Sequence, residues 1–362
     1  MKTYLLSLVL FFMGQLQAQN VGIGISAPIA GLQVNSNNGF MVKGVLGSGS
    51  SLTETGAGEK LIWYPKKGAL RVGGVTPFLN SYWDDVNIGN YSMALGYDVL
   101  AKGTGSVALG GLSRAFGDYS LATGNSTTAS GNSSTAMGIN SVASGSASVA
   151  IGNNAQASAT NSIAIGTDVS TNGKVGSMIL GDGGDGDGTH VFTTEADNQL
   201  FTRFKGGYKF YTSGWGTTLG AVLLPGANSW SSFSDERLKE NFEALNSEEV
   251  LKKLSAVNYT SWNYKIQDSK TFRHYGIMAQ DFFKAFGHDN YGTIGNETMV
   301  NPIDMMGIAY SAIQALEKRT QKIEDLQEEN SNLKKQINAL ALTLANIQQQ
   351  LTSIFSKQIN SQ

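Results

Sequence analysis

The sequence predicts a mostly β protein with an α-helical C-terminal end, and three observations lead to this fold class. Glycine, serine and alanine recur at a spacing of fourteen residues in the first half of the chain. Charged residues make up only 15% of the chain and glycine supplies 44 of its 362 residues, which is typical of repetitive β architecture rather than of a helical enzyme. Apolar residues then recur in heptads near the end of the chain, which predicts a long self-associating helix.

Composition excludes several classes of function. The 26 basic side chains nearly balance the 28 acidic ones, so the net charge does not favour binding to nucleic acid or to an anionic membrane surface. The absence of cysteine excludes disulfides, thiol catalysis, cysteine-ligated metals and a lipid anchor on an N-terminal cysteine. We therefore expect neither a cofactor nor a metal.

Residues 1–18 have the pattern of a secretory signal peptide. One basic residue precedes a short apolar run from Tyr4 to Met13, and the small residue Ala18 comes before Gln19. The run is too short to span a bilayer comfortably, and no later segment is long and apolar enough to do so. We expect a mature chain that is secreted or held at a cell surface, has no membrane span, and gains stability by self-association.

Residues 19–88 are predicted to be β-rich, with short strands at Asn20–Gly24 and Ala30–Val34 separated by turns. Residues 89–181 form the repeat, in which each unit predicts two short strands with glycine at tight corners. A flexible linker is the alternative, but a linker has no reason to keep a strict period. Three series define the repeat: Gly96, Gly110, Gly124, Gly138, Gly152 and Gly166; Ser92, Ser106, Ser120, Ser134, Ser148 and Ser162; and Ala94, Ala108, Ala122, Ala136, Ala150 and Ala164.

A single coil of this repeat lacks a sufficient core. Its predicted interior holds alanine and single aliphatic residues, so one chain buries little apolar surface, and we expect other copies of the coil to complete the apolar stripe. Thr123 and Ala159 depart from the series and are expected to weaken packing locally without changing the architecture.

Residues 182–233 are predicted to be a loop followed by β-hairpins. The acidic, glycine-rich run 182–188 offers oxygen ligands for calcium, but the repeated nonapeptide of convincing calcium sites is missing, so a solvated loop is favoured. The segments Val191–Thr193, Leu200–Phe204 and Tyr208–Tyr211 alternate as hairpin strands. Their aromatic residues favour burial between chains over a carbohydrate-binding face.

Residues 234–305 are predicted to form a small α+β domain. Helical spacing is found over Glu236–Leu245 and Ser247–Leu254, and Val257–Tyr264 alternates as a strand. Residues 306–357 are predicted to be a coiled coil in which Asn330, at an a position, controls register and Arg319, at a d position, loosens the early part. The heptads do not specify the number of strands. Their a positions are Leu316, Ile323, Asn330, Ile337, Leu344 and Leu351, and their d positions are Ala312, Arg319, Leu326, Leu333, Leu340, Ile347 and Ile354.

Ser234 and Lys239 are the candidate catalytic pair. A serine hydroxyl is a weak nucleophile until a base removes its proton, and a buried lysine can serve as that base. The alternative interpretation makes Ser234 or Asp235 a helix N-cap and Lys239 a surface cation. Five residues is not a same-face helical spacing, so contact requires either that Ser234 lie outside the helix or that the lysine come from another chain.

The remaining polar candidates have weaker support. His274 either assists the pair or is structural, and these two alternatives are equally favoured. His190 and His288 have no catalytic residues around them, and Arg237 is expected to pair with Asp235 or a carbonyl and to have no catalytic role.

Two stretches of the sequence resemble known families. The pattern Ser-x-Ala-Ile-Gly over Gly89–Gly166, with a degenerate unit at Ser177–Gly181, is similar to the head repeats of trimeric autotransporter adhesins. Residues 229–362 resemble the intramolecular chaperone of phage tailspikes, tail fibres and endosialidases, on the strength of Ser-Asp-Glu-Arg-Leu-Lys from Ser234 and His-Tyr-Gly-Ile-Met-Ala-Gln from His274. Residues 19–88 resemble the N-terminal stretch of exported bacterial tail-fibre-like proteins.

These resemblances imply a trimeric left-handed parallel β-roll head and a chaperone that acts once on its own chain as a serine endopeptidase. Ser234 would cut after Phe233, with Lys239 as its base and no external substrate. Partners would be the other chains of the homotrimer and a cell-surface or glycan ligand of unknown identity, on the cell envelope or on a phage-derived particle. One alternative is a purely structural trimer that retains an inactive chaperone. A glycan-degrading enzyme is the weakest alternative, because the repeat has no paired carboxylates.

Overall fold

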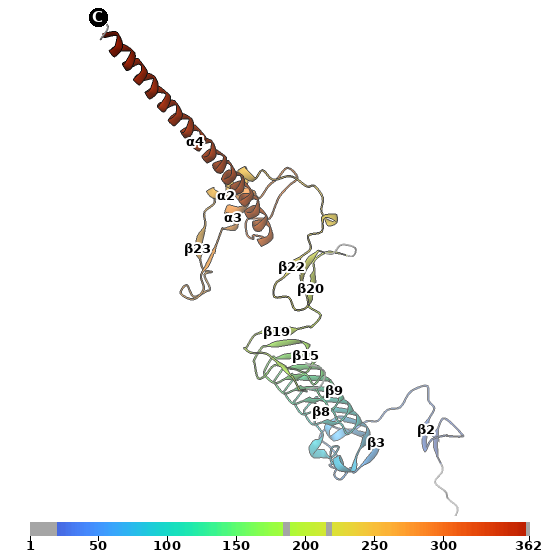
Figure 1. The fold of residues 1–362 in the computed structure, drawn as a ribbon. Helices are drawn as coiled ribbons and strands as arrows, with labels where there is room; N and C mark the ends of the chain where they lie inside the picture. Colours follow the sequence, from blue (N-terminus) through green and yellow to red (C-terminus); the bar gives the residue numbers. More distant parts are fainter. Residues whose placement is uncertain (1–19, 184–188, 215–218, 360–362) are drawn as a thin grey trace, which may run out of the picture. The chain divides into compact units, whose positions relative to one another are not determined.

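The computed structural model describes residues 20–183, 189–214 and 219–359 (Figure 1). The predicted signal peptide, residues 1–18, lies outside the described residues. The chain divides into two compact units, one ending at Phe233 and the other beginning at Ser234. At the start of the first unit, β1 (Val21–Ile23) and β2 (Leu32–Val34) form the two expected short strands, which pair in parallel.

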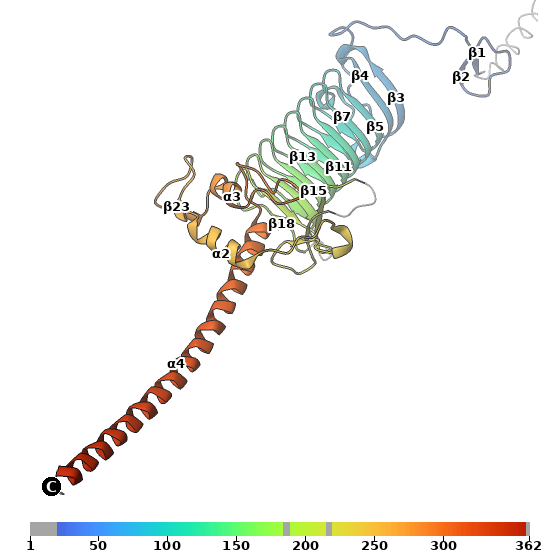
Figure 2. The same cartoon turned by 90° about the horizontal axis from the view of Figure 1, so that it is seen from above.

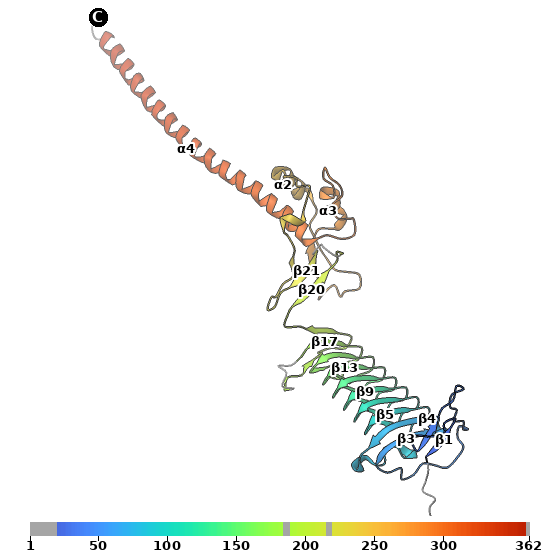
Figure 3. The same ribbon diagram turned by 90° about the vertical axis from the view of Figure 1, so that its right-hand side faces the viewer.

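The repeat folds as a parallel β-solenoid in which each coil contributes one long and one short strand (Figure 3). The long strands stack into one sheet and the short strands into a second. Residues that are fourteen apart in sequence therefore lie next to each other on neighbouring strands of the same sheet. The long strands are β5 (Met93–Tyr97), β7 (Val107–Gly111), β9 (Leu121–Asn125), β11 (Thr135–Ile139), β13 (Val149–Asn153), β15 (Ile163–Thr167), β17 (Met178–Asp182) and β19 (Leu200–Arg203). The short strands are β6 (Leu100–Ala101), β8 (Arg114–Ala115), β10 (Thr128–Ala129), β12 (Val142–Ala143), β14 (Gln156–Ala157), β16 (Val169–Ser170) and β18 (Phe192–Thr193).

Alanine fills the narrow interior between the two sheets. The register places each central alanine of a long strand directly over the next, as Ala136 lies between Ala122 and Ala150, and all of these side chains are fully buried. A second alanine column, from Ala101 to Ala157, lines the short strands in the same way. The sheets therefore lie too close together for larger side chains, and the alanine series is a packing requirement of the coil.

The serine series supplies hydrogen bonds at the corners. In most coils the buried serine hydroxyl donates to the carbonyl three residues earlier, for example from Ser120 to Gly117 at 2.6 Å and from Ser148 to Gly145 at 2.6 Å. Ala159 replaces a corner glycine, yet its carbonyl still accepts from Ser162 at 2.7 Å. The same carbonyls also accept from the backbone N–H of these serines, at 3.3 Å for Ser120 and Ser148, so the side-chain bonds give the buried hydroxyls a partner and tighten the corner.

Larger side chains close both ends of the solenoid. At the first end β4 (Ala69–Val75) joins the long-strand sheet in parallel with β5, and β3 (Gly58–Tyr64) pairs with it in antiparallel orientation (Figure 2). Arg71 occupies the alanine column there and donates to the Ser92 and Ala101 carbonyls at 3.0 and 2.9 Å. Burial lowers the pKa of Arg71 to about 10. At the other end the column continues through Ile179 to Phe201.

The fully buried Trp83 also contributes to the first end, where its indole Nε1–H donates to the Val99 carbonyl at 3.0 Å. Three short 3-10 turns surround this region: η1 (Pro65–Lys67), η2 (Pro77–Leu79) and η3 (Asp85–Asn87). Capping of this kind shields the open faces of a stacked repeat.

The predicted hairpins over residues 191–204 are wrong. Strands β18 and β19 pair in parallel with β16 and β17, so they extend the solenoid beyond the repeat at 89–181. Only the following segment is antiparallel: β20 (Tyr208–Tyr211), β21 (Gly220–Leu223) and β22 (Ser231–Ser232) form a three-stranded sheet with β21 in the centre.

Each coil has left-handed backbone at two corner positions seven residues apart, and Ala147 occupies one of them with φ of +52°. Left-handed backbone costs most L-residues about 1–2 kcal/mol, whereas asparagine tolerates it better. Asn161 fills the equivalent position one coil later with φ of +57°. We therefore expect Ala147→Asn to stabilise the head by about 0.5–1 kcal/mol and to raise its thermal denaturation midpoint.

Ser144→Asn, at an exposed position nearby without positive φ, provides the matched control and should leave the midpoint unchanged. A lower midpoint for Ala147→Asn than for this control would contradict the assignment of backbone strain to the corner.

The second unit is a small α+β domain followed by one long helix. Its elements are the 3-10 turn η4 (Glu236–Leu238), α2 (Ser247–Ala256), β23 (Thr260–Trp262), β24 (His274–Gly276), α3 (Ala279–Phe286) and α4 (Pro302–Ile359). Val250, Ile277, Phe282, Phe286 and Ala312 form its buried core. The predicted helix over residues 236–245 is wrong: helical backbone ends after Leu238, and Asn241 is left-handed with φ of +57°. The predicted strand at 257–264 is shorter than expected.

Helix α4 is 58 residues long (Figure 1), and the predicted heptad positions lie on it from Ala312 to Ile354. Its early part packs against α2: Ala312 is buried, and Arg319 forms an ion pair with Glu248 at 2.7 Å. Further along, the a and d side chains are exposed, for example Leu326 by 52% and Ile337 by 63%. Among residues 20–183, 189–214 and 219–359, no helix is both long enough and apolar enough to cross a membrane.

Candidate functional site

The first residues of the second unit bring Ser234 and Lys239 together. Ser234 lies just before the 3-10 turn Glu236–Leu238, and Lys239 lies just after it. Because the turn is only three residues long, the chain folds back and the Lys239 Nζ donates to the Ser234 Oγ at 2.7 Å. The spacing allowed contact either if Ser234 lay outside the helix or if the lysine came from another chain. In the structure Ser234 lies outside the 3-10 turn, and Lys239 of the same chain contacts it.

Asp235 and Arg237 hold this turn. Asp235 is the N-cap residue, and its Oδ1 accepts from the Arg237 backbone N–H at 2.9 Å. The Arg237 guanidinium also pairs with the Asp235 carboxylate at 2.6 Å, which agrees with the expected pairing. This side-chain hydrogen bond lowers the pKa of Asp235 below its ordinary value and raises that of Arg237. The carboxylate thus stays ionised in its capping position.

The pair is exposed to solvent in the single chain. Ser234 and Lys239 are both exposed, and so is Phe233, whose carbonyl belongs to the predicted scissile bond. In this arrangement the ammonium donates to the serine oxygen, whereas a neutral amine would accept the hydroxyl proton across the same short distance. The serine–lysine contact thus forms within one chain, at a position that is open to solvent.

His274 lies on β24, where its ring contacts Trp262, Tyr264 and Gln267. Its ring stacks on Trp262 with centroids 4.7 Å apart and lies edge-on to Tyr264, and its Nε2 is 3.1 Å from the Gln267 Oε1. The contacts of His274 with described residues do not include Ser234 or Lys239. Its packing fits the structural alternative, and a catalytic role for His274 stays a prediction.

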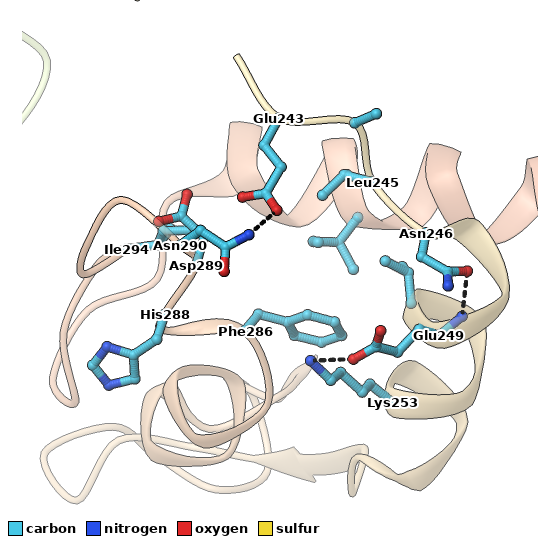
Figure 4. A pocket seen from close by; sticks show the side chains of 13 residues that line it. Glu243, Leu245, Asn246, Glu249, Lys253, Phe286, His288, Asp289, Asn290 and Ile294 are labelled. Carbon is cyan, nitrogen blue, oxygen red and sulfur yellow. Dashed lines mark hydrogen bonds and ion pairs between the residues drawn. The ribbon is translucent and has the colours of Figure 1, made fainter. Parts of the chain in front are cut away.

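A pocket of about 330 Å³ lies between the segment before α2 and the loop after α3 (Figure 4). Its polar side chains are largely paired with one another: Lys253 with Glu249 at 3.0 Å, and Asn290 with Glu243. His288 lines the pocket and lies edge-on to Phe283. Neither Ser234 nor Lys239 lines it, so it is separate from the candidate site.

No cluster of three or more His, Asp or Glu suitable for a metal occurs among the described residues. Most of the acidic run considered as a calcium ligand, residues 184–188, lies outside them.

One arrangement next to the predicted scissile bond was missed from the sequence. The Phe233 ring stacks on Tyr211 of β20, with centroids 6.2 Å apart and an angle of 26° between the ring planes. The aromatic residues of both segments are visible in the sequence, but their pairing depends on a sheet register that the sequence does not specify.

Comparison with known families agrees with this division of the chain. Residues 234–289 match the family model described as chaperone of endosialidase. Residues 101–127, 129–155 and 143–168 match the YadA head domain repeat. A search against curated proteins found no match to the chain. Domains of these kinds indicate an extracellular or surface protein.

Both matches lie within features that the structure defines. The YadA-type matches fall within the solenoid, and the chaperone match begins at Ser234, where the second compact unit begins. The chain therefore carries YadA-type head repeats and an endosialidase-type chaperone domain, which together fit a tail-fibre-like adhesin with a C-terminal chaperone.

Proposed function

We propose that the chain is an exported, fibre-forming homotrimer whose C-terminal unit acts as an intramolecular trimerisation chaperone and then cuts itself off between Phe233 and Ser234. The observation that carries the cleavage proposal is the 2.7 Å contact between the Lys239 Nζ and the Ser234 Oγ. A serine next to a lysine at hydrogen-bonding distance is the minimal arrangement for nucleophilic attack assisted by a base.

The proposed cleavage is a hydrolysis of the Phe233–Ser234 peptide bond that consumes one water molecule. Neutral Lys239 takes the Ser234 hydroxyl proton as the Oγ attacks the Phe233 carbonyl carbon, and the same proton is delivered to the departing Ser234 nitrogen. The C–N bond breaks and an ester forms between the Phe233 acyl group and the Ser234 Oγ. Water then hydrolyses the ester, which leaves a Phe233 carboxylate, a free Ser234 amine and the original hydroxyl.

Assembly provides a means of controlling this reaction. A lysine becomes a base near neutral pH when burial disfavours its charged form. Because Lys239 is exposed in the single chain, we propose that neighbouring chains bury it when the trimer forms. Cleavage would then follow assembly, and an unassembled chain would keep its chaperone.

Two exposed apolar surfaces support self-association. In the solenoid, the residues on either side of each central alanine face away from the alanine core, and among them Met93 and Met137 are 38% and 36% exposed. On α4 the apolar heptad positions beyond Arg319 are exposed over most of the helix. Contiguous apolar stripes of this kind indicate interfaces, and head repeats similar to these form trimers in autotransporter adhesins.

The experiment is intact-mass spectrometry of the purified chain after folding. The wild type should yield two fragments, one ending at Phe233 and one starting at Ser234, and Ser234→Ala should stay whole. Lys239→Arg is the informative variant: it keeps the positive charge but cannot lose a proton near neutral pH, so it should also stay whole.

Lys252→Ala removes an exposed lysine of α2 and is the control, which should cleave like the wild type. A folded wild-type trimer that remains intact after prolonged incubation would exclude self-cleavage. That result would favour the alternative of a structural trimer that retains its chaperone.

A further inference from the structure

The residues before the proposed scissile bond lie on an antiparallel sheet. Ser231 and Ser232 form β22, which pairs with Val222 and Ala221 of β21. Continuing this register by one residue places Phe233 opposite Gly220, which in turn pairs with Tyr211 of β20. The chain therefore approaches Ser234 as an extended edge strand, which is how many proteins bind a peptide segment.

Aromatic pairs hold this strand on both faces of the sheet. Phe233 and Tyr211 lie on the two outer strands, on one face, and their rings reach across the central strand where Gly220 has no side chain. On the opposite face, Trp230 contacts Phe210 with centroids 5.6 Å apart and an angle of 59° between the ring planes. On that face the small residue Ala221 lies opposite Phe210, and the register continues to Leu223 opposite Trp230. The two small residues of the central strand, Gly220 and Ala221, thus leave room for rings of the outer strands to meet across it.

We propose that these four aromatic residues, Phe210, Tyr211, Trp230 and Phe233, form a clamp that positions the Phe233 carbonyl for attack by Ser234. The proposal rests on the proposed self-cleavage. The clamp fixes the acyl side of the scissile bond, and the turn held by Asp235 fixes the serine side. Restricting both sides raises the fraction of chains in an attack geometry, which is a large part of what an enzyme gains from substrate binding.

The clamp also predicts the fate of the product. All four rings belong to the first unit, so hydrolysis leaves the new Phe233 carboxylate directly after β22, which is still paired with β21. The sheet is consequently the acyl-binding half of the site and remains with the mature fibre. Tyr211 is a positioning residue in this scheme, because it acts through Phe233 and not on the reacting atoms.

The test compares cleavage rates of full-length variants. Tyr211→Ala should slow the appearance of the Phe233-ending fragment by about tenfold, and Tyr211→Phe, which keeps the ring, should restore it. Phe233→Ala should slow cleavage similarly, and the double variant should be no slower than either single one, because both remove the same contact. The control is Tyr208→Ala, which removes an aromatic residue from the same strand, where it contacts Phe204 and not Phe233.

Thermal denaturation distinguishes a loss of positioning at the scissile bond from a loss of folding stability. In the uncleavable Ser234→Ala background, Tyr211→Ala and Tyr208→Ala should show the same thermal denaturation midpoint, so any rate difference between them reflects positioning. If the wild type cleaves, Ser234→Ala does not, and Tyr211→Ala cleaves as fast as Tyr208→Ala, the clamp is overturned while self-cleavage stands. If the wild type does not cleave at all, both proposals fall.

Discussion

Gly110→Ala should prevent the head from folding, whereas Gly111→Ala, one residue along the same strand, should be tolerated. Gly110 has φ of +105°, a backbone conformation that residues with a side chain rarely adopt. A Cβ built on Gly110 would lie 2.2 Å from the Gly124 carbonyl oxygen, with the backbone carbon and nitrogen of Gly124 at 3.1 and 3.2 Å. Those atoms belong to the next coil, so they can move only if the stack opens.

The expected cost of Gly110→Ala is more than about 4 kcal/mol per chain, because the unfavourable backbone conformation adds to the steric overlap. The result should be insoluble protein, or soluble protein without the β-signal in circular dichroism. A Cβ on Gly111 would meet only the Asn125 Nδ2 at 3.7 Å, an ordinary contact, so this control should fold. Equal stability of the two variants would contradict the stacking that the structure assigns to the glycine column.

The head could be predicted largely because its information is local and repeated. One period of fourteen residues specifies the corner glycine, the buried alanine and the corner serine, and every coil repeats the same contacts. The prediction failed where the period is interrupted. The sequence between Asp182 and Phe192 does not follow the period, so periodicity predicts hairpin strands at β18 and β19, although these strands continue the two stacks.

The second unit shows the opposite situation, because its decisive contacts are not local. The heptads predicted a long helix, but they gave no reason for Arg319 at a core position. The structure supplies one, since Arg319 pairs with Glu248, which is 71 residues away in sequence. Near Ser234, helical spacing predicted a helix through Leu245, and the left-handed Asn241 and the short turn at 236–238 were not recognisable from periodicity. That same short turn decides whether Lys239 reaches Ser234.

Removing residues 234–362 before folding should prevent assembly of the correct trimer. Successive coils stack in the same register and have similar outward-facing residues, so three chains that associate with a slip of one coil keep most of their contacts. A coiled coil that forms first removes this ambiguity, because the polar Asn330 among apolar a and d positions favours one register. The exposed apolar seam of α4 is suited to this task, and because α4 follows the head in the chain, the head has already been synthesised when the coil forms.

The sharpest comparison uses one polypeptide, residues 19–233, prepared in two ways. Released from the full chain by self-cleavage, it should remain a trimer by light scattering and resist heat as the uncleaved Ser234→Ala protein does, because the wound solenoid no longer depends on the coil. Expressed directly, it should yield aggregates or oligomers of mixed mass, because nothing aligns the three chains before the coils pack. The two samples are covalently identical, so a difference between them can come only from the folding route. If direct expression gives the same trimer with the same heat resistance, the C-terminal unit is not a chaperone.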